Sequence, residues 1–141
     1  MAATSDTPRP IAGVLDWPLL WPLARLALVS AYLIGGVQKL TDFPSAIAEQ
    51  AHFGLQPAWL WAAAAIAVEL IGSLLVIVNR LVWLGAGALG VLTSVAMLTA
   101  NDFWHMDGHD RFMALNAFFE HLGLIAGLVL VSILSMRARR A

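Results

Sequence analysis

Five side chains that can exchange protons or pair as ions lie within otherwise apolar stretches of the sequence. They are Arg25, Lys39, Glu69, Glu120 and His121. A charged side chain in the middle of a membrane costs at least ~2.5–3.5 kcal/mol, so such residues usually pair inside the protein and mark a functional site. Groups of this kind in unlike environments suit proton-coupled chemistry on a small bound molecule.

The composition indicates that these residues belong to an integral membrane protein. The chain has 141 residues, of which 60% are hydrophobic and 12% charged, whereas soluble domains average ~45–50% apolar and ~25% charged residues. The absence of cysteine excludes disulfides, thiol redox chemistry and cysteine-bound metal clusters. The formal net charge of −1 is uninformative as a total, because membrane orientation follows the positions of Lys and Arg in the loops. No nucleic-acid partner is expected.

The apolar stretches predict an all-α fold, an antiparallel bundle of four transmembrane helices. A span needs about 20 residues to cross the ~30 Å hydrocarbon core. The predicted spans are 19–40, 57–78, 81–100 and 112–135. They form one domain over 19–135, between an N-terminal segment 1–18 and a basic tail 136–141. The opening residues lack a basic n-region and a small-residue cleavage site, so we expect the first span to be retained.

The connections between the spans are of two kinds. Asn79-Arg80 alone separates the second and third spans, which requires an antiparallel hairpin. The longer connection after the first span has Asp42 as a helix N-cap, Pro44 in the first turn and Gly54 beyond the end. This pattern predicts a short surface helix.

The basic residues predict the orientation in the membrane. If the first span runs outward, the inner side carries five arginines and the outer loops carry two basic residues. The inner arginines are Arg9, Arg80, Arg137, Arg139 and Arg140; the outer residues are Lys39 and Arg111. The positive-inside rule then places both termini in the cytoplasm.

Depth along the helices predicts an ion pair between Arg25 and Glu69. At ~1.5 Å per residue, Arg25 lies about 9 Å and Glu69 about 14 Å from the cytoplasmic ends of their spans. The long arginine stem can bridge this gap. The pair can be purely structural, and small residues near it are explained by helix packing alone.

A second group of polar residues falls in the outer half of the bundle and predicts a polar cavity open to the outside. Its expected ligand-binding residues are Tyr32, Lys39, Asn101, Asn116, Glu120 and His121. Among them Glu120, His121 and Lys39 are the catalytic candidates. From the loop before the fourth span, Asp102, Trp104 and His105 are predicted to form a contact surface.

Two histidine hypotheses compete at this end of the chain. His121 lies about 100° around the helix from Glu120, so it can reach a neighbouring helix. A histidine satisfied by a backbone carbonyl is favoured over metal ligation. A metal near His105, Asp107 and His109 is a weak alternative to a solvated loop, and no metal site is predicted.

Three segments resemble the DoxX family of four-helix bacterial membrane proteins. They are RLALVSAYLIGGVQKLTDFP, AVELIGSLLVIVNR and NDFWHMDGHDRFMALNAFFEHLGLIAGLVL. The resemblance extends from about Arg25 to the end of the last span. It implies a protein of the bacterial inner membrane, associated with quinone-linked or oxidative-stress oxidoreductase systems.

Two functions therefore remain open, and a third is weaker. In the first, a quinone, the one candidate cofactor, binds in the outer half, where Lys39 or His121 hydrogen-bonds a carbonyl and Glu120 exchanges protons. An oxidoreductase partner must then supply the electrons. In the second, the chain is a non-catalytic membrane partner or assembly factor for another protein. Transport of a solute is less favoured, because four helices leave little room for a pathway unless the chain forms a homo-oligomer.

Overall fold

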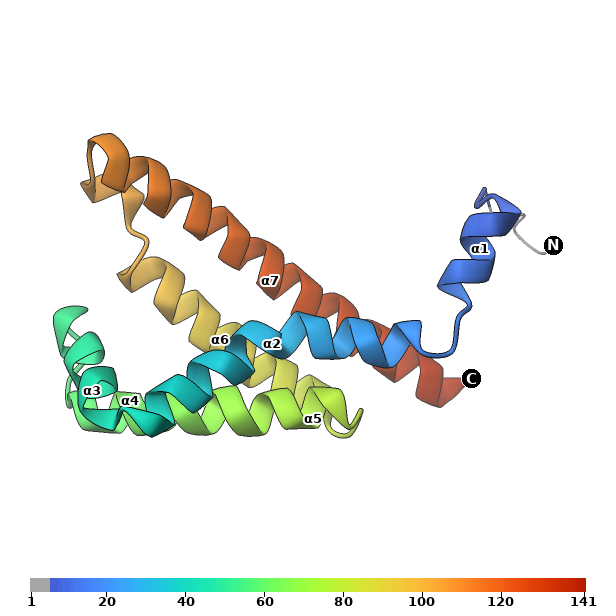
Figure 1. Ribbon diagram of the computed structural model, residues 1–141, viewed down its shortest axis with the longest axis horizontal. Helices are drawn as coiled ribbons and strands as arrows, with labels where there is room; N and C mark the ends of the chain where they lie inside the picture. The colour runs from blue at the N-terminus through green and yellow to red at the C-terminus, as the bar shows by residue number, and fades with distance from the viewer. Residues whose placement is uncertain (1–5) are drawn as a thin grey trace.

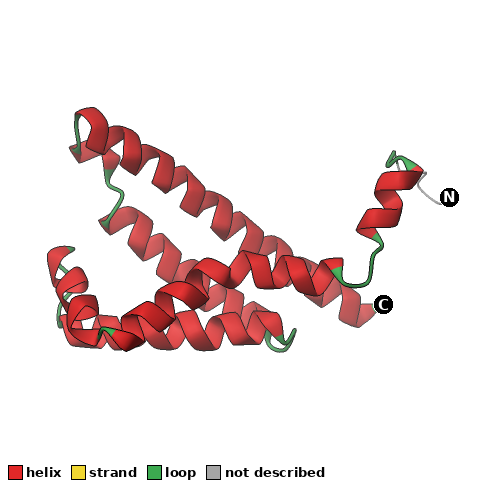
Figure 2. Ribbon diagram, viewed as in Figure 1, coloured by secondary structure: helices red, strands yellow, loops and turns green. Residues whose placement is uncertain are grey.

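The computed structural model describes residues 6–141, which form helices joined by short loops and contain no strand (Figure 2). Four segments are long and apolar enough to cross a membrane. They are Leu20–Thr41, Ala58–Ile77, Val82–His105 and Gly108–Arg140. The prediction of an all-α membrane protein with four spanning helices is confirmed.

The first span, α2 (Leu20–Thr41), is followed by the short helix α3 (Phe43–His52). Asp42 caps α3, because its carboxylate accepts from the backbone N–H of Ser45 at 3.2 Å and satisfies a free donor of the first turn. Gly54, with φ of 76°, adopts the left-handed conformation that commonly ends a helix. The predicted surface helix is confirmed.

The second span contains a short change of helix type. It begins as α4 (Ala58–Ala67), continues as a π-helical turn η1 (Val68–Gly72) and ends as α5 (Ser73–Ile77). A π-turn accommodates one additional residue within an α-helix and occurs often at functional sites. Glu69 lies in this turn.

A tight turn leads from α5 into the third span, α6 (Val82–Thr99). Asn79 and Leu81 both have positive φ, 57° and 48°; asparagine tolerates this conformation far better than leucine does. A 3₁₀ turn, η2 (Phe103–His105), then connects α6 to α7 (Gly108–Arg140). The predicted fourth span, 112–135, is therefore part of a longer helix that takes in most of the predicted tail.

An additional helix, α1 (Arg9–Leu15), lies near the N-terminus. The sequence reading gave the segment 1–18 no helix, and residues 1–5 of that segment lie outside the described residues. Figure 1 shows α1 standing apart from the spans, and none of its residues is buried.

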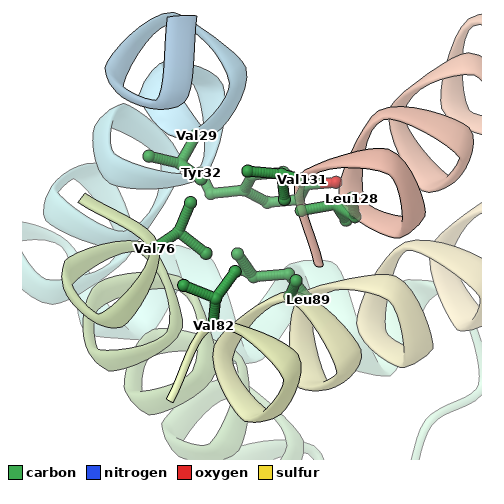
Figure 3. Close-up of a cluster of buried hydrophobic side chains, with 8 residues drawn as sticks. Val29, Tyr32, Val76, Val82, Leu89, Leu128 and Val131 are labelled. Carbon is green, nitrogen blue, oxygen red and sulfur yellow. The ribbon is translucent and has the colours of Figure 1, made fainter. Parts of the chain in front are cut away.

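The spans meet most closely at one end of the molecule. We call this the terminal end, since it holds the start of α2, the Asn79–Leu81 turn and the end of α7; the opposite end, with α3 and η2, is the loop end (Figure 1). Figure 3 shows apolar side chains from four spans directed toward one another. This buried core consists of Val29, Tyr32, Val76, Val82, Ala86, Leu89, Leu128 and Val131.

The spans separate toward the loop end. Figure 1 shows α6 and α7 running side by side and leading away from α2, α3 and α4. At the point where α6 crosses the second span, a Cβ on Gly85 would lie 2.6 Å from the carbonyl oxygen of Gly72. The two backbones can approach this closely only because both residues lack a side chain, as is common between membrane helices.

Candidate functional site

A partly buried ion pair connects the first two spans. The Lys39 ammonium donates to both carboxylate oxygens of Glu69, and each N···O distance is 3.1 Å. The side chains are 20% and 11% exposed, respectively. Lys39 comes from the last turn of α2 and Glu69 from η1, so the pair lies where the spans begin to separate.

Two glycines of α2 make room for this pair. A Cβ on Gly35 would lie 3.4 Å from Lys39 Nζ and 3.5 Å from Glu69 Oε1. A Cβ on Gly36 would lie 2.8 Å from the Leu70 side chain, closer than real Cβ contacts allow. The Gly35-Gly36 step thus permits α2 to lie against η1 and keeps the space beside the ion pair open.

The predicted pair between Arg25 and Glu69 is wrong. Arg25 Nη1 instead donates to the carbonyl oxygen of Val76 at 3.2 Å, and its guanidinium lies 5.3 Å from the centroid of the Trp21 ring. Arg25 is 7% exposed, and among the described residues its Nε has no hydrogen-bond partner.

The prediction assumed that the axes of the first two spans are parallel and that their cytoplasmic ends lie at the same depth. In Figure 1, α2 begins beyond the point where α5 ends. Residues of α2 therefore lie against residues of the second span that are nearer the terminal end than the count predicted. Arg25 consequently faces Val76, while Lys39 lies beside Glu69.

Two small cavities share the ion pair as part of their walls. One has a volume of about 200 Å³; besides Lys39 and Glu69 it is lined by Tyr32, Thr93 and His121. The other, of about 110 Å³, extends toward α3 and the start of the second span. Leu92 and Ala96 of α6 line both cavities, so the walls are apolar apart from a few polar groups.

The hydrogen bond between Tyr32 and Thr93 is 2.6 Å long and joins α2 to α6. Thr93 Oγ1 donates to the Leu89 carbonyl at 2.7 Å, and a hydroxyl has a single proton. Tyr32 is therefore the donor, and its own oxygen is left to accept a hydrogen bond at the edge of the cavity.

His121 completes the larger cavity from α7. Its Nδ1 lies 2.6 Å from the carbonyl oxygen of Ala117; because a carbonyl can only accept, Nδ1 carries a proton. In the neutral ring, Nε2 is then an acceptor. The backbone-satisfied histidine favoured by the sequence is observed, and the same side chain also lines the cavity.

Half of the predicted ligand-binding residues do not come to this site. Tyr32, Lys39 and His121 converge on the larger cavity. Asn101 instead lines an open depression at the loop end, together with His105 and Asp107. Asn116 and Glu120 lie exposed on α7, because that helix has already diverged from α2 at their level.

The predicted contact residues form part of an aromatic cluster at the loop end. His105 Nδ1 lies 3.3 Å from Asp102 Oδ2. The Trp104 ring packs edge-on against Phe103 and Phe118 at centroid distances of 5.2 and 6.0 Å, yet Trp104 is 48% exposed. Across residues 6–141, no three His, Asp or Glu side chains gather as metal ligands.

The main residue that sequence reasoning misplaced is Glu69, which it paired with Arg25 instead of Lys39. The π-turn that holds Glu69 leaves no mark in the sequence, since Val68–Gly72 reads as ordinary apolar helix. The adjacent glycines Gly35 and Gly36 were the one feature of the sequence that could have indicated this contact. Two adjacent glycines near the end of a span indicate close approach of a neighbouring helix, and that approach brings Lys39 to Glu69.

Comparison with known proteins identifies the family. The sequence model of DoxX matches residues 20–102. No curated protein and no solved structure matches the chain. The matched region runs from the start of α2 through α6 and contains both partners of the ion pair, whereas His121 lies outside it. Since the match covers more than half of the sequence, this four-span membrane protein belongs to the DoxX family.

Proposed function

We propose that the cavity beside Lys39 and Glu69 binds a small lipophilic molecule of the quinone class, as part of a quinone-linked oxidoreductase system. The observation that carries this proposal is the ion pair itself: a lysine and a glutamate line two cavities between membrane helices. Buried charges in a membrane protein usually mark a ligand or proton pathway. The cavities are small beside typical ligand pockets of ~300–1,000 Å³, which suits a ring-sized head group with its tail in the lipid.

The donors and acceptors around the larger cavity fit a quinone head group. Lys39 has three N–H donors, of which two are engaged with Glu69, so one is available to a carbonyl oxygen. His121 Nε2 can accept from a hydroxyl, and Leu92 and Leu124 supply apolar walls. When bound, the quinone would supply the two-electron chemistry. Glu69 and His121 would hold the protons, and a partner protein would provide the electrons.

Quinone binding to the purified protein tests this proposal. A short-chain ubiquinone is added in mild detergent, and retained ligand is scored by native mass spectrometry. Lys39→Met combined with Glu69→Leu removes both charges without leaving one unpaired, and should abolish retention. Glu120→Gln is the matched control, because it changes a carboxylate of the same membrane region that does not line either cavity; retention should persist. The proposal is contradicted if the wild type, the double variant and Glu120→Gln all retain the quinone equally, or if none of them retains it.

We further propose that the protein lies in the bacterial inner membrane with both termini in the cytoplasm. Arg80, Arg137, Arg139 and Arg140 all belong to the terminal end, which supports this orientation under the positive-inside rule. The chain has no cysteine, so single-cysteine variants report unambiguously. An impermeant maleimide should label Ser45→Cys in intact cells and Ala141→Cys only after lysis; the reverse pattern would overturn the orientation.

A second function is favoured by the exposed aromatic cluster around Trp104. An aromatic side chain that is 48% exposed on a packed base is typical of protein contact surfaces. If the chain is instead a non-catalytic membrane partner, Trp104→Ala should reduce co-purification of a specific protein, while the Lys39 and Glu69 variant should leave it unchanged.

A further inference from the structure

A pocket of about 330 Å³ lies at the terminal end, between the start of α6 and the last turns of α7. Its walls combine two chemical characters. The apolar part consists of Leu81, Val82, Trp83 and Met136. The cationic part consists of the guanidinium groups of Arg139 and Arg140.

The charge of the pocket is entirely positive. No Asp or Glu lines it, and Arg80 and Arg137 lie close by in the sequence. The Arg140 side chain forms no hydrogen bond or ion pair with any other described residue. The cationic side of the pocket therefore lacks a counter-ion from residues 6–141.

Hydrogen bonds hold one wall of the pocket in place. Arg139 Nη2 donates to the carbonyl oxygen of Asn79, and Ser135 Oγ donates to the Asn79 side-chain oxygen. These bonds tie the end of α7 to the turn that precedes α6. A guanidinium has five N–H donors, so Arg139 can hold the turn and still present donors to an anion.

The depth of the pocket matches the lipid head-group region. Helix α7 has 33 residues and is therefore about 50 Å long at ~1.5 Å per residue, which exceeds the ~30 Å hydrocarbon core. Because arginine is costly in the hydrocarbon core, the end of α7 that carries Arg137, Arg139 and Arg140 extends into the interface. Trp83, 69% exposed beside them, is the residue type that concentrates at that level.

We propose that this pocket binds the head group of an anionic phospholipid from the surrounding membrane. Arg139 and Arg140 would hold the phosphate through charge-assisted hydrogen bonds, while Trp83, Leu81 and Met136 would contact the glycerol and the start of the acyl chains. Basic pockets between membrane helices are known to bind such lipids. This inference is independent of the quinone site, which lies in the other half of the molecule.

A lipid-retention experiment tests the pocket. The full chain is placed in nanodiscs of phosphatidylcholine with a minor fraction of phosphatidylglycerol, released into the gas phase and scored for bound lipid. The wild type should retain one phosphatidylglycerol in preference to phosphatidylcholine. Arg139→Gln and Arg140→Gln should each weaken this preference about five-fold, as expected for one arginine near the lipid surface. Arg137→Gln removes the same charge from a residue outside the pocket and should have little effect.

Trp83→Ala distinguishes a lipid from a free anion. It keeps every positive charge, so a site for soluble phosphate would be unaffected, whereas retention of phosphatidylglycerol should fall. Inorganic phosphate at millimolar concentration should not displace the lipid. The proposal is overturned if Arg137→Gln acts as strongly as Arg140→Gln, if Trp83→Ala has no effect, or if phosphate displaces the lipid. Because Arg140 holds no other part of the fold, loss of retention in its variant cannot be ascribed to unfolding.

Discussion

The two ends of the bundle differ in how their helices are held together. At the terminal end, Val29, Val76 and Leu89 are fully buried, and Gly72 and Gly85 bring two backbones into contact. Toward the loop end α6 and α7 separate from α2 and the second span. There α2 meets the second span through small buried residues such as Ala62 and through an ion pair beside two cavities. The hydrophobic effect contributes little between helices in lipid. Close packing of all four spans therefore holds one end, whereas at the other end a polar contact supplements packing between only two spans and leaves space for a ligand.

The largest change in stability should come from removing one partner of the ion pair. Lys39→Met leaves the Glu69 carboxylate buried without its cation, and should lower the free energy of unfolding by about 3 kcal/mol. The measurement is reversible unfolding in mixed detergent micelles. Lys39→Met with Glu69→Leu should recover most of this loss, because no uncompensated charge remains. If the double variant is as unstable as the sum of both single variants, the two residues are not coupled.

Filling the contact between Gly72 and Gly85 should disturb the terminal end nearly as much. A Cβ at position 85 would lie 2.6 Å from a carbonyl oxygen and 2.9 Å from Leu75 Cβ, so Gly85→Ala should cost ~1–3 kcal/mol through overpacking. Gly87→Ala is the matched control on the same helix, since its Cβ would meet nothing within 4 Å. Equal stabilities of the two variants in the same unfolding assay would show that the helices do not approach this closely.

A smaller effect is expected from the hydrogen bond at the border between the two ends. Tyr32→Phe removes the 2.6 Å contact with Thr93 and should destabilise the protein by about 0.6 kcal/mol, the average for a hydrogen bond between membrane helices. A double-mutant cycle with Thr93→Val isolates the pairwise energy. A coupling energy near zero would indicate that the two hydroxyls do not meet.

The smallest effect should come from Ser73, within the closely packed end. Its side chain is completely buried, and its hydroxyl has no hydrogen-bond partner among the described residues. Replacing an unsatisfied hydroxyl removes its desolvation penalty, so Ser73→Ala should be neutral or slightly stabilising. Marked destabilisation on unfolding would show that the hydroxyl has a partner, such as a buried water.

Much of the fold could be read from the sequence because its signals are local. Apolar length predicts the four spans, Asn79-Arg80 predicts the hairpin, and Asp42 with Gly54 predicts the surface helix. The helix α1 was missed because Pro8, Pro10 and Gly13 give it a poor helical pattern. The site could be read only in part: Lys39, Tyr32 and His121 were identified, but Glu69 was given the wrong partner.

The sequence by itself therefore determined which residues are costly to bury in a membrane, since the free energy of transferring a charge or an apolar segment depends on residue type and run length alone. Only the tertiary structure decided which of these residues meet. That outcome depends on where α2 begins relative to the end of α5, on the π-turn at Glu69 and on the divergence of α7 from α2. Each results from packing between distant segments, through glycine contacts such as Gly36 with Leu70, and such contacts have no local signature in the chain.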